Sequence, residues 1–411
     1  MKHSDDVDHL AECPACRQRF AANVVTFDPA ARRNREREFS STAARLERER
    51  DAATDVVSRY LRDTPPEEWS RLAEMPDLRN NAALEQMSDE VRQRLHRKPR
   101  EALAIANLSA SIAESLSPSQ YPAVVLAQLR ATAWKDRAST LRYLARYDEA
   151  IEAADRGEEA LAPFASLEFD RAIVRLVKGM ILAQQERFDD AQAILSECRR
   201  VFREFGDTTK YVQSGRAEAN VLYRASRHEE AKLLLHELLR DAAEAGDVES
   251  QAGIHNNLGY CATHLSDFAA ANIHFSEAVA KFTDLGFTAE VPRTERGAGL
   301  VLIARGQITN GLARLRAARS AFLNAGMIEE AGLCALNIVE VLIDRGQNAD
   351  ARELAQNVIS EFTAAGLDDR AIAAVVRLSD AIDAEGATAE TVRTTHTILS
   401  ALQNEIRDIA Q

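Results

Sequence analysis

The chain has 411 residues, a length that allows two or three ordinary domains or one long repeat array. Its formal net charge of −13 argues against DNA or RNA as the main ligand. No stretch approaches the roughly 18 to 20 apolar residues needed to cross a bilayer, and none resembles a signal peptide, so we expect a cytoplasmic protein without membrane binding.

Residues 1–25 are predicted to form a small head that carries the only motif with recognisable chemistry. His9, Cys13 and Cys16 stand at i, i+4 and i+7, so one helical turn and the start of the next bring them together. Pro14 favours a turn at a helix boundary. Thiolates and imidazole at this spacing suit one tetrahedral zinc ion. Two alternatives stay open: cysteines that bind nothing, and a redox dithiol, although no βαβ pattern surrounds it.

The same stretch resembles the zinc-finger module of zinc-containing anti-sigma factors, whose signature is His-x3-Cys-x2-Cys. All three signature positions are matched. In that family the fourth ligand lies well upstream of the motif; here His3 is the natural substitute, and Asp5, Asp6 and Asp8 are weaker ones. The resemblance implies a bound zinc ion and a sigma factor as one candidate partner.

Residues 26–118 are predicted to form a helical adaptor without chemistry of its own. A long polar helix is expected over residues 30–62, where seven arginines between Arg32 and Arg50 are interleaved with glutamates, as on a solvated helix face. Thr64 is expected to cap a new helix, because two prolines and two glutamates follow it. Ser117 and Pro118 end a helix predicted over residues 100–116.

From residue 119 onward, two kinds of turn marker recur in step. A five-residue corner appears six times, with a spacing of 41 residues once and 40 residues four times. The corners are Arg146–Ala150, Arg187–Ala191, Arg227–Ala231, Asp267–Ala271, Gln307–Gly311 and Gln347–Ala351. The second marker is a glycine every 40 residues: Gly206, Gly246, Gly286, Gly326 and Gly366. Two independent markers in step predict a stacked array over residues 119–390, of about six units and a partial one.

The first unit resembles a tetratricopeptide repeat. Its matching residues are Trp134, Leu141, Tyr147 and Ala150. Twelve residues before the end of each corner stands a small residue in five units and Val339 in the sixth. The small ones are Ala138, Gly179, Ala219, Gly259 and Gly299. The resemblance implies an all-α, right-handed α-solenoid in which these residues let helix A lie close to helix B. Residues 391–411 are expected to form a C-terminal capping helix.

The tetratricopeptide resemblance also implies that helix A of each unit lines an inner groove, where peptides or partner helices bind. With the corners as the register, the expected groove residues are Lys135, Arg216, Asn220, Asn256, Tyr260, Arg293 and Arg296. Guanidinium and amide groups bind a carboxylate or an acidic peptide through charge-assisted hydrogen bonds. The alternative is that these cations pair with acids on adjacent repeats.

No catalytic constellation is evident in the sequence. It has no Gly-rich phosphate loop, no His-Glu-x-x-His and no Gly-x-Ser-x-Gly, so we predict a protein that is not an enzyme. Five histidines between His228 and His274 are expected to serve as surface or packing residues. Cys198, Cys261 and Cys334 are expected to be small buried apolar residues.

Two functions fit these observations. The first is a cytoplasmic regulator or scaffold that binds a partner protein or peptide in the groove, with the zinc head tuning it as in anti-sigma factors. The second is an adaptor that presents a substrate to a separate effector enzyme such as a protease. Both functions need only a groove, so the sequence leaves the partner open.

Overall fold

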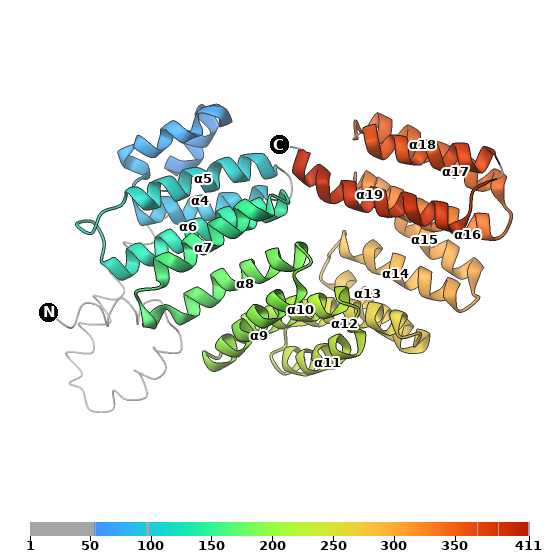
Figure 1. Cartoon of the computed structure of the whole chain (residues 1–411), viewed down its shortest axis with the longest axis horizontal. Coiled ribbons are helices and arrows are strands. Elements are labelled where there is room, and N and C mark those ends of the chain that lie inside the picture. The colour runs from blue at the N-terminus through green and yellow to red at the C-terminus, as the bar shows by residue number, and fades with distance from the viewer. Residues whose placement is uncertain (1–52, 54, 96–97, 368, 385, 410–411) are drawn as a thin grey trace.

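The computed structural model describes residues 53, 55–95, 98–367, 369–384 and 386–409, and every regular element in these ranges is a helix. Figure 1 shows them as a curved succession of helices. The predicted head (1–25) and most of the predicted polar helix (30–62) lie outside the described residues. Within the described ranges, no helix combines the length and apolar character needed to cross a membrane.

The region before the array is a small helical bundle. Its elements are a helical stretch at 55–63, the 3-10 helices η1 (Pro66–Glu74) and η2 (Pro76–Leu78), and helices α4 (Asn81–Arg94) and α5 (Pro99–Ser115). The prediction of a helix over 100–116 is confirmed by α5. The prediction that Thr64 caps a helix is wrong: Pro65 occupies the N-cap position of η1, and the Thr64 carbonyl oxygen instead accepts a 2.9 Å hydrogen bond from Trp69 Nε1.

The array consists of helix pairs, as predicted. The pairs are α6 (Ala123–Tyr143) with α7 (Tyr147–Leu161), α8 (Glu168–Gln184) with α9 (Phe188–Glu204), α10 (Thr208–Arg224) with α11 (His228–Glu244), α12 (Val248–His264) with α13 (Phe268–Asp284), α14 (Glu290–Ala304) with α15 (Ile308–Asn324), and α16 (Ile328–Asp344) with α17 (Asn348–Ala364). Helices α18 (Asp369–Asp383) and α19 (Ala389–Ile409) follow. Each helix packs on the next, which makes the molecule an α-solenoid.

The turns from helix B to the next helix A explain the glycine marker. Gly206 has a left-handed φ of 73°, and the N–H of Asp207 donates a 3.0 Å hydrogen bond to the Phe202 carbonyl, which closes the end of α9. The side chain of Asp207 then caps α10 by accepting a hydrogen bond from the Lys210 N–H. Each glycine therefore stops one helix, and in this unit the next residue starts the following one.

The turns from helix A to helix B need a left-handed residue as well. In the first four units this residue is not glycine: the positions are Ala145, Glu186, Ser226 and Ser266, with φ between 50° and 61°. Glycine takes the position in the next two units, at Gly306 and Gly346. A left-handed backbone costs a residue with a side chain about 1 kcal/mol, so the turn itself imposes this conformation. The last residue of each corner, which is Gly311 in the fifth unit and alanine in the others, marks this turn only indirectly.

Close packing of helix A on helix B confirms the role of the small residues. A Cβ atom added at Gly179 would lie 2.7 Å from Leu195 Cγ, and one added at Gly259 would lie 2.7 Å from Phe275 Cδ1. Both distances are too short for a side chain, so the two helices approach where glycine permits it. Val339 is fully buried, and the sixth unit thus accommodates a larger residue at this position.

Buried apolar side chains recur along the whole array. Helix B carries a buried residue at a fixed position 40 residues apart: Phe202, Ala242, Phe282, Phe322 and Phe362. These side chains belong to apolar clusters that extend from one unit into the next, as a repeat that cannot bury its apolar stripe alone requires. Stability therefore depends on the neighbours of each unit.

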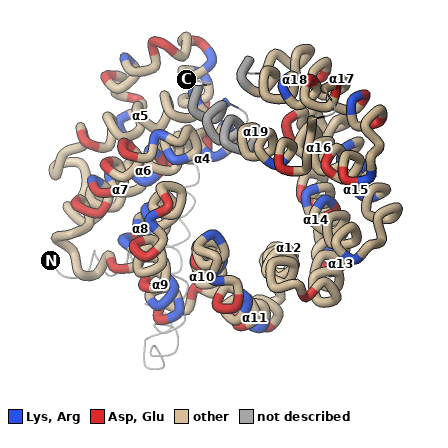
Figure 2. The backbone as a smooth tube through the Cα atoms, turned by 45° about the vertical axis from the view of Figure 1, so that its right-hand side comes forward, with Lys and Arg blue, Asp and Glu red and all other residues tan. Residues whose placement is uncertain are grey.

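The helices follow one another around an incomplete ring. Contacts join α6 to α8, α10 to α12 and α12 to α14, which places helix A of successive units side by side. Figure 2 shows these helices on the inner side of the ring and α9, α11, α13 and α15 on the outer side. Helix α19 packs against α16 and α18 and lies on the inner side of α16. We call the surface formed by helix A of the units the inner face.

Candidate functional site on the inner face

Arg216 is positioned by a glycine on the neighbouring unit. It lies on α10, and its guanidinium group extends over Gly253 on α12. A Cβ atom at position 253 would lie 2.6 Å from Arg216 Cζ, well inside the contact distance of real side chains. The glycine at this inner-register position thus forms a notch in which the guanidinium group fits.

 

Arg216 has no hydrogen-bonding or ionic partner among the described residues. Its Nε atom is buried without a hydrogen bond. Burial lowers the pKa of Arg216 from its usual value, and the nearby carboxylates of Glu249, Asp247 and Glu290 oppose this shift without forming an ion pair. A guanidinium group that is removed from water and left unpaired is costly in free energy, so this group is prepared to bind an anion.

Arg296 is a second inner-face cation without an ion pair to any described residue. It lies on α14 and is half-buried. Its charge acts on neighbouring groups: together with burial it lowers the pKa of His396, and it opposes the burial that raises the pKa of Cys334 to about 11. The inner face between α10 and α14 therefore holds two cations whose charge no described carboxylate neutralises by contact.

The other two predicted cations are paired within the protein. Arg293 Nη1 lies 2.6 Å from Glu290 Oε1, and Nη2 lies 3.2 Å from Glu330 Oε1 on the next unit. Burial lowers the pKa of Arg293, but the two glutamates outweigh burial and raise it. Lys135 Nζ lies 2.8 Å from Oδ1 of the buried Asp136. The four cations thus divide into two that are paired and two that are not.

The three uncharged residues predicted for the groove differ in their exposure and in their contacts with neighbouring side chains. Asn220 on α10 is exposed. Asn256 Oδ1 on α12 accepts a 3.2 Å hydrogen bond from Thr294 Oγ1, which leaves the amide NH2 group without a described partner. The ring of Tyr260 lies edge-on to Phe275, with 5.1 Å between ring centroids. Asn220 and Asn256 therefore retain polar groups for a ligand, whereas the Tyr260 ring is largely a packing residue.

An aromatic cluster lies where the corners of two units meet. The rings of His228 and His264 stack with 4.6 Å between centroids, and the Tyr223 ring lies 5.1 Å from His264 and 5.2 Å from His228. Sequence reasoning assigned these histidines separately and missed the cluster. The signal was present, because His228 is the second residue of one corner and His264 precedes the next corner by three residues.

Three other histidines, one each from α11, α12 and α13, lie close together. His255 Nδ1 lies 3.0 Å from His274 Nδ1, and the His236 and His274 rings lie 5.8 Å apart between centroids. Within the described part of the chain, no group of three or more His, Cys, Asp or Glu residues has a geometry that could hold a metal ion. The predicted zinc ligands His3, His9, Cys13 and Cys16 lie outside the described residues, so that site stays a prediction.

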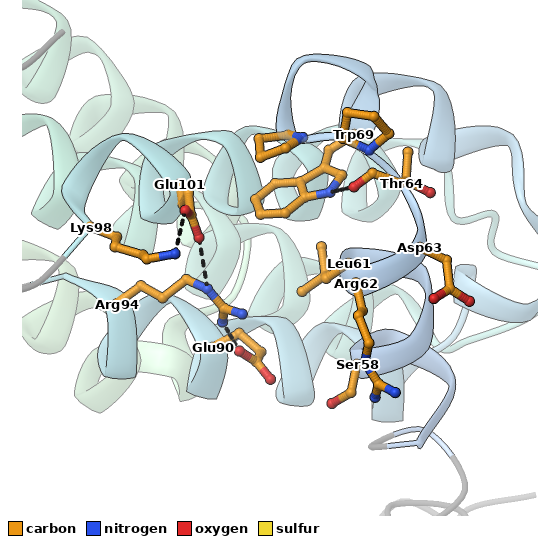
Figure 3. Close-up of a pocket in the computed structure, with 12 residues that line it drawn as sticks. Ser58, Leu61, Arg62, Asp63, Thr64, Trp69, Glu90, Arg94, Lys98 and Glu101 are labelled. Atoms are coloured by element: carbon orange, nitrogen blue, oxygen red, sulfur yellow. Dashed lines mark hydrogen bonds and ion pairs between the residues drawn. The ribbon is translucent and has the colours of Figure 1, made fainter.

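A pocket of about 570 Å³ lies in the bundle before the array (Figure 3). Four of its charged groups neutralise one another: Arg94 pairs with Glu90 and lies 3.4 Å from Glu101, and Lys98 Nζ lies 2.8 Å from Glu101. Trp69, on the pocket wall, donates its indole N–H to the backbone. Because these groups already have partners, the inner face is the stronger candidate for a binding site.

Comparison with known proteins identifies the fold. The sequence matches no protein-family model and no curated protein. The apo form of RapI is similar in structure, with a TM-score of 0.56, 14% identity, and coverage of 87% of this chain and 98% of RapI. A signal transduction ATPase with a tetratricopeptide repeat sensor from Pyrococcus horikoshii is similar with a TM-score of 0.55 and 13% identity, over 88% of this chain and 55% of the ATPase.

The fold is a tetratricopeptide-type helical repeat array. At such low identity these similarities establish the fold alone, and they agree with the helix pairs and the inner and outer layers described above. The repeat architecture predicted from the corners is confirmed. The fold places helix A on the inner face, so the residues that the register selects come from neighbouring helices of one continuous surface.

Proposed function

We propose that this protein is a non-enzymatic regulator or scaffold that binds a partner protein or peptide on its inner face. The observation that carries the proposal is the pair of unneutralised guanidinium groups at Arg216 and Arg296. A guanidinium group stays charged at every physiological pH and binds carboxylates through two parallel hydrogen bonds. An acidic segment of a partner would supply the counter-charges that the array itself leaves out.

The arrangement of the groups favours an extended ligand over a small molecule. Arg216 lies on α10 and Arg296 lies on α14, and Asn256 lies on α12 between them. Recognition groups on successive units suit a peptide or helix that follows the array and meets them in turn. The repeat array of the Pyrococcus ATPase is described as a sensor, and a binding role for the same type of array supports this proposal by analogy of fold.

The N-terminal motif adds a separate part to the proposal. His9, Cys13 and Cys16, with His3 as the fourth ligand, would hold one zinc ion and form a head that tunes partner binding. The anti-sigma resemblance makes a sigma factor one candidate partner for that head. This part can fail while the inner-face proposal stands, because the two rest on different residues.

A capture experiment with full-length protein tests the inner-face proposal. The variant Arg216→Gln/Arg296→Gln removes both charges while keeping polar side chains of similar shape. Glutamine is used because a carboxylate at position 216 would face Glu249 and Asp247. The control, Arg240→Gln/Arg316→Gln, removes two exposed charges from outer helices α11 and α15.

We expect the inner-face variant to lose a partner that both wild type and control retain, with unchanged helical circular dichroism. Equal capture by all three proteins would place the site elsewhere. The identity of the captured protein separates the two functions considered from the sequence: transcription components favour the regulator, and a hydrolase or its substrate favours the adaptor.

A further inference from the structure

The inner face changes character towards the C-terminal end of the array. In α10, α12 and α14 the inner-register positions carry polar groups such as Arg216, Asn256 and Arg296. In α16 the corresponding positions carry Leu333 and Leu336, which are only 6% and 1% exposed. An apolar surface on the inside of an open array needs a cover, because exposed apolar area is unfavourable in water.

Helix α19 supplies that cover. Val392 and Leu399 of α19 are buried and belong to the same apolar cluster as Leu333 and Leu336. Arg393 Nη1 lies 2.8 Å from Oε1 of Glu340, an inner-register residue of α16. The α19 helix thus presents apolar side chains and a cation to a surface made of leucines and a carboxylate.

The position of α19 is not that of the next helix B in the solenoid. Helix α17 packs between α16 and α18 in the regular way, whereas α19 folds back onto α16 and α18 from the inner side (Figures 1 and 2). A helix that only closed the end of the array would cover α18 alone. Instead α19 lies where the inner face of the other units is open to a ligand.

The covered surface adjoins the candidate site. His396 of α19 is close enough to Arg296 of α14 for that charge to act on it. Arg393 is 62% exposed, so the ion pair that it forms with Glu340 lies at the edge of the contact with access to water. An exposed ion pair contributes little to stability, and the buried contact among the described side chains of α19 rests mainly on Val392, Thr395 and Leu399.

We propose that the inner face of α16 is a helix-docking surface, that α19 is its tethered occupant, and that an amphipathic helix of the partner displaces α19. This inference rests on the proposed function and extends the same face from anion recognition to helix recognition. The partner helix would carry two apolar residues on one face and a cation that pairs with Glu340. In α19 these roles belong to Val392, Leu399 and Arg393. Displacement of α19 would couple occupancy of the groove to a change at the C-terminal end.

A labelled synthetic peptide of residues 389–409 tests the docking surface without the natural partner. In full-length Val392→Asp/Leu399→Asp protein, buried carboxylates would release α19 from α16. We expect the peptide to bind this variant at least tenfold more tightly than it binds wild type, in which α19 occupies the surface. Adding Glu340→Arg to the variant should weaken the peptide, and an Arg393→Glu peptide should recover binding to it.

Hydrogen exchange on full-length protein covers the case in which the released variant does not fold. We expect α19 amides of wild type to exchange faster than those of α16, and the exposed substitution Arg393→Glu to accelerate exchange in α19 only. Exchange of α19 in step with the whole array, or peptide binding that does not differ between released variant and wild type, would overturn the proposal and make α19 a fixed part of the core.

The same peptide separates this inference from the proposed function. Arg216 lies on α10, whereas α19 packs on α16 and α18, so Arg216→Gln added to the released variant should leave peptide binding unchanged. Loss of partner capture without loss of peptide binding confirms that the two surfaces act separately. If peptide binding fails while partner capture still depends on Arg216, the docking inference falls and the proposed function stands.

Discussion

The guanidinium group of Arg216 occupies the space that a side chain at Gly253 would fill. The two residues belong to different units, 37 residues apart, and meet because α10 and α12 lie side by side on the inner face. Glycine at position 253 therefore fixes where the Arg216 charge points, although it carries no chemistry itself. Arg216 is held by shape and not by a partner carboxylate, which leaves its hydrogen-bond donors without a partner among the described residues.

A double-mutant cycle tests this relationship. Gly253→Ala should displace the guanidinium group and weaken partner binding by about tenfold or more, since a charge-assisted hydrogen bond contributes about 1.5–3 kcal/mol. Arg216→Gln should have a similar effect. If Gly253 acts by positioning Arg216, the double variant will bind no worse than Arg216→Gln alone. Additive losses, measured by titration with the isolated partner, would show that the two residues act independently.

The small residue at the contact between helix A and helix B gives a stability prediction. In Gly259→Val the new side chain would collide with Phe275, so we expect a loss of about 1–3 kcal/mol in the free energy of unfolding. Chemical denaturation followed by circular dichroism measures it. Val339→Ile provides a comparison at the equivalent position of the sixth unit, which already accepts a β-branched residue. Equal tolerance at both positions would contradict a close approach at Gly259.

The turn chemistry explains why the architecture was predictable from sequence. A left-handed glycine such as Gly206 and a capping aspartate such as Asp207 act through their own backbone neighbourhood, so their spacing reports helix ends directly. The A-to-B corners were recognised less directly, because Glu186 and Ser226 adopt the left-handed conformation without being glycine. The prediction for Thr64 was one residue too early, because η1 begins at Pro66 and Pro65 therefore stands at its N-cap.

The candidate site was predictable only in part. The register placed Arg216 and Arg293 on one face, but it could not tell that Arg293 has Glu330 as a partner on the next unit while Arg216 has none. Such pairing depends on side-chain rotamers and on the distance between helices, which periodicity does not specify. The contact between Arg393 and Glu340 joins residues that are 53 positions apart and depends on α19 folding back onto α16. No local sequence pattern predicts that α19 folds back.

Histidine titration predicts a dependence of stability on pH. Burial, followed by the charges of His255 and His236, lowers the pKa of His274 to about 4, below its usual value of 6.5. Between these two values the unfolded chain binds more protons than the folded protein, so stability falls as the pH drops from 6.5 towards 4. Protonation of both rings would also break the contact between His255 Nδ1 and His274 Nδ1.

We expect His274→Gln to reduce this pH dependence by about 1–2 kcal/mol, a value discounted for the partial exposure of the ring to solvent. Thermal unfolding of wild type and variant at pH 7, 6, 5 and 4 provides the measurement. His396→Gln serves as a comparison, because its pKa is lowered by burial and by Arg296 at a different place in the array. Parallel curves for wild type and His274→Gln would remove His274 as a source of the effect.

The N-terminal motif predicts a metal content. Purified full-length protein should contain about one zinc ion per chain, and Cys13→Ser/Cys16→Ser should lose it, because thiolates are its strongest ligands. Cys198→Ala is the matched control, since Cys198 is buried in the array with its pKa raised to about 12 by burial. Elemental analysis by mass spectrometry decides the question. Metal-free wild type, or zinc retained in the double variant, would exclude this site.

Site-specific photo-crosslinking tests most directly whether the partner binds on the inner face. A photoreactive phenylalanine derivative replaces Asn220, an exposed residue of inner helix α10, or Leu233, a residue of outer helix α11 that is 69% exposed. We predict that the partner is crosslinked from position 220 and not from position 233. Crosslinking from position 233 alone would contradict the account and place the partner on the outer surface.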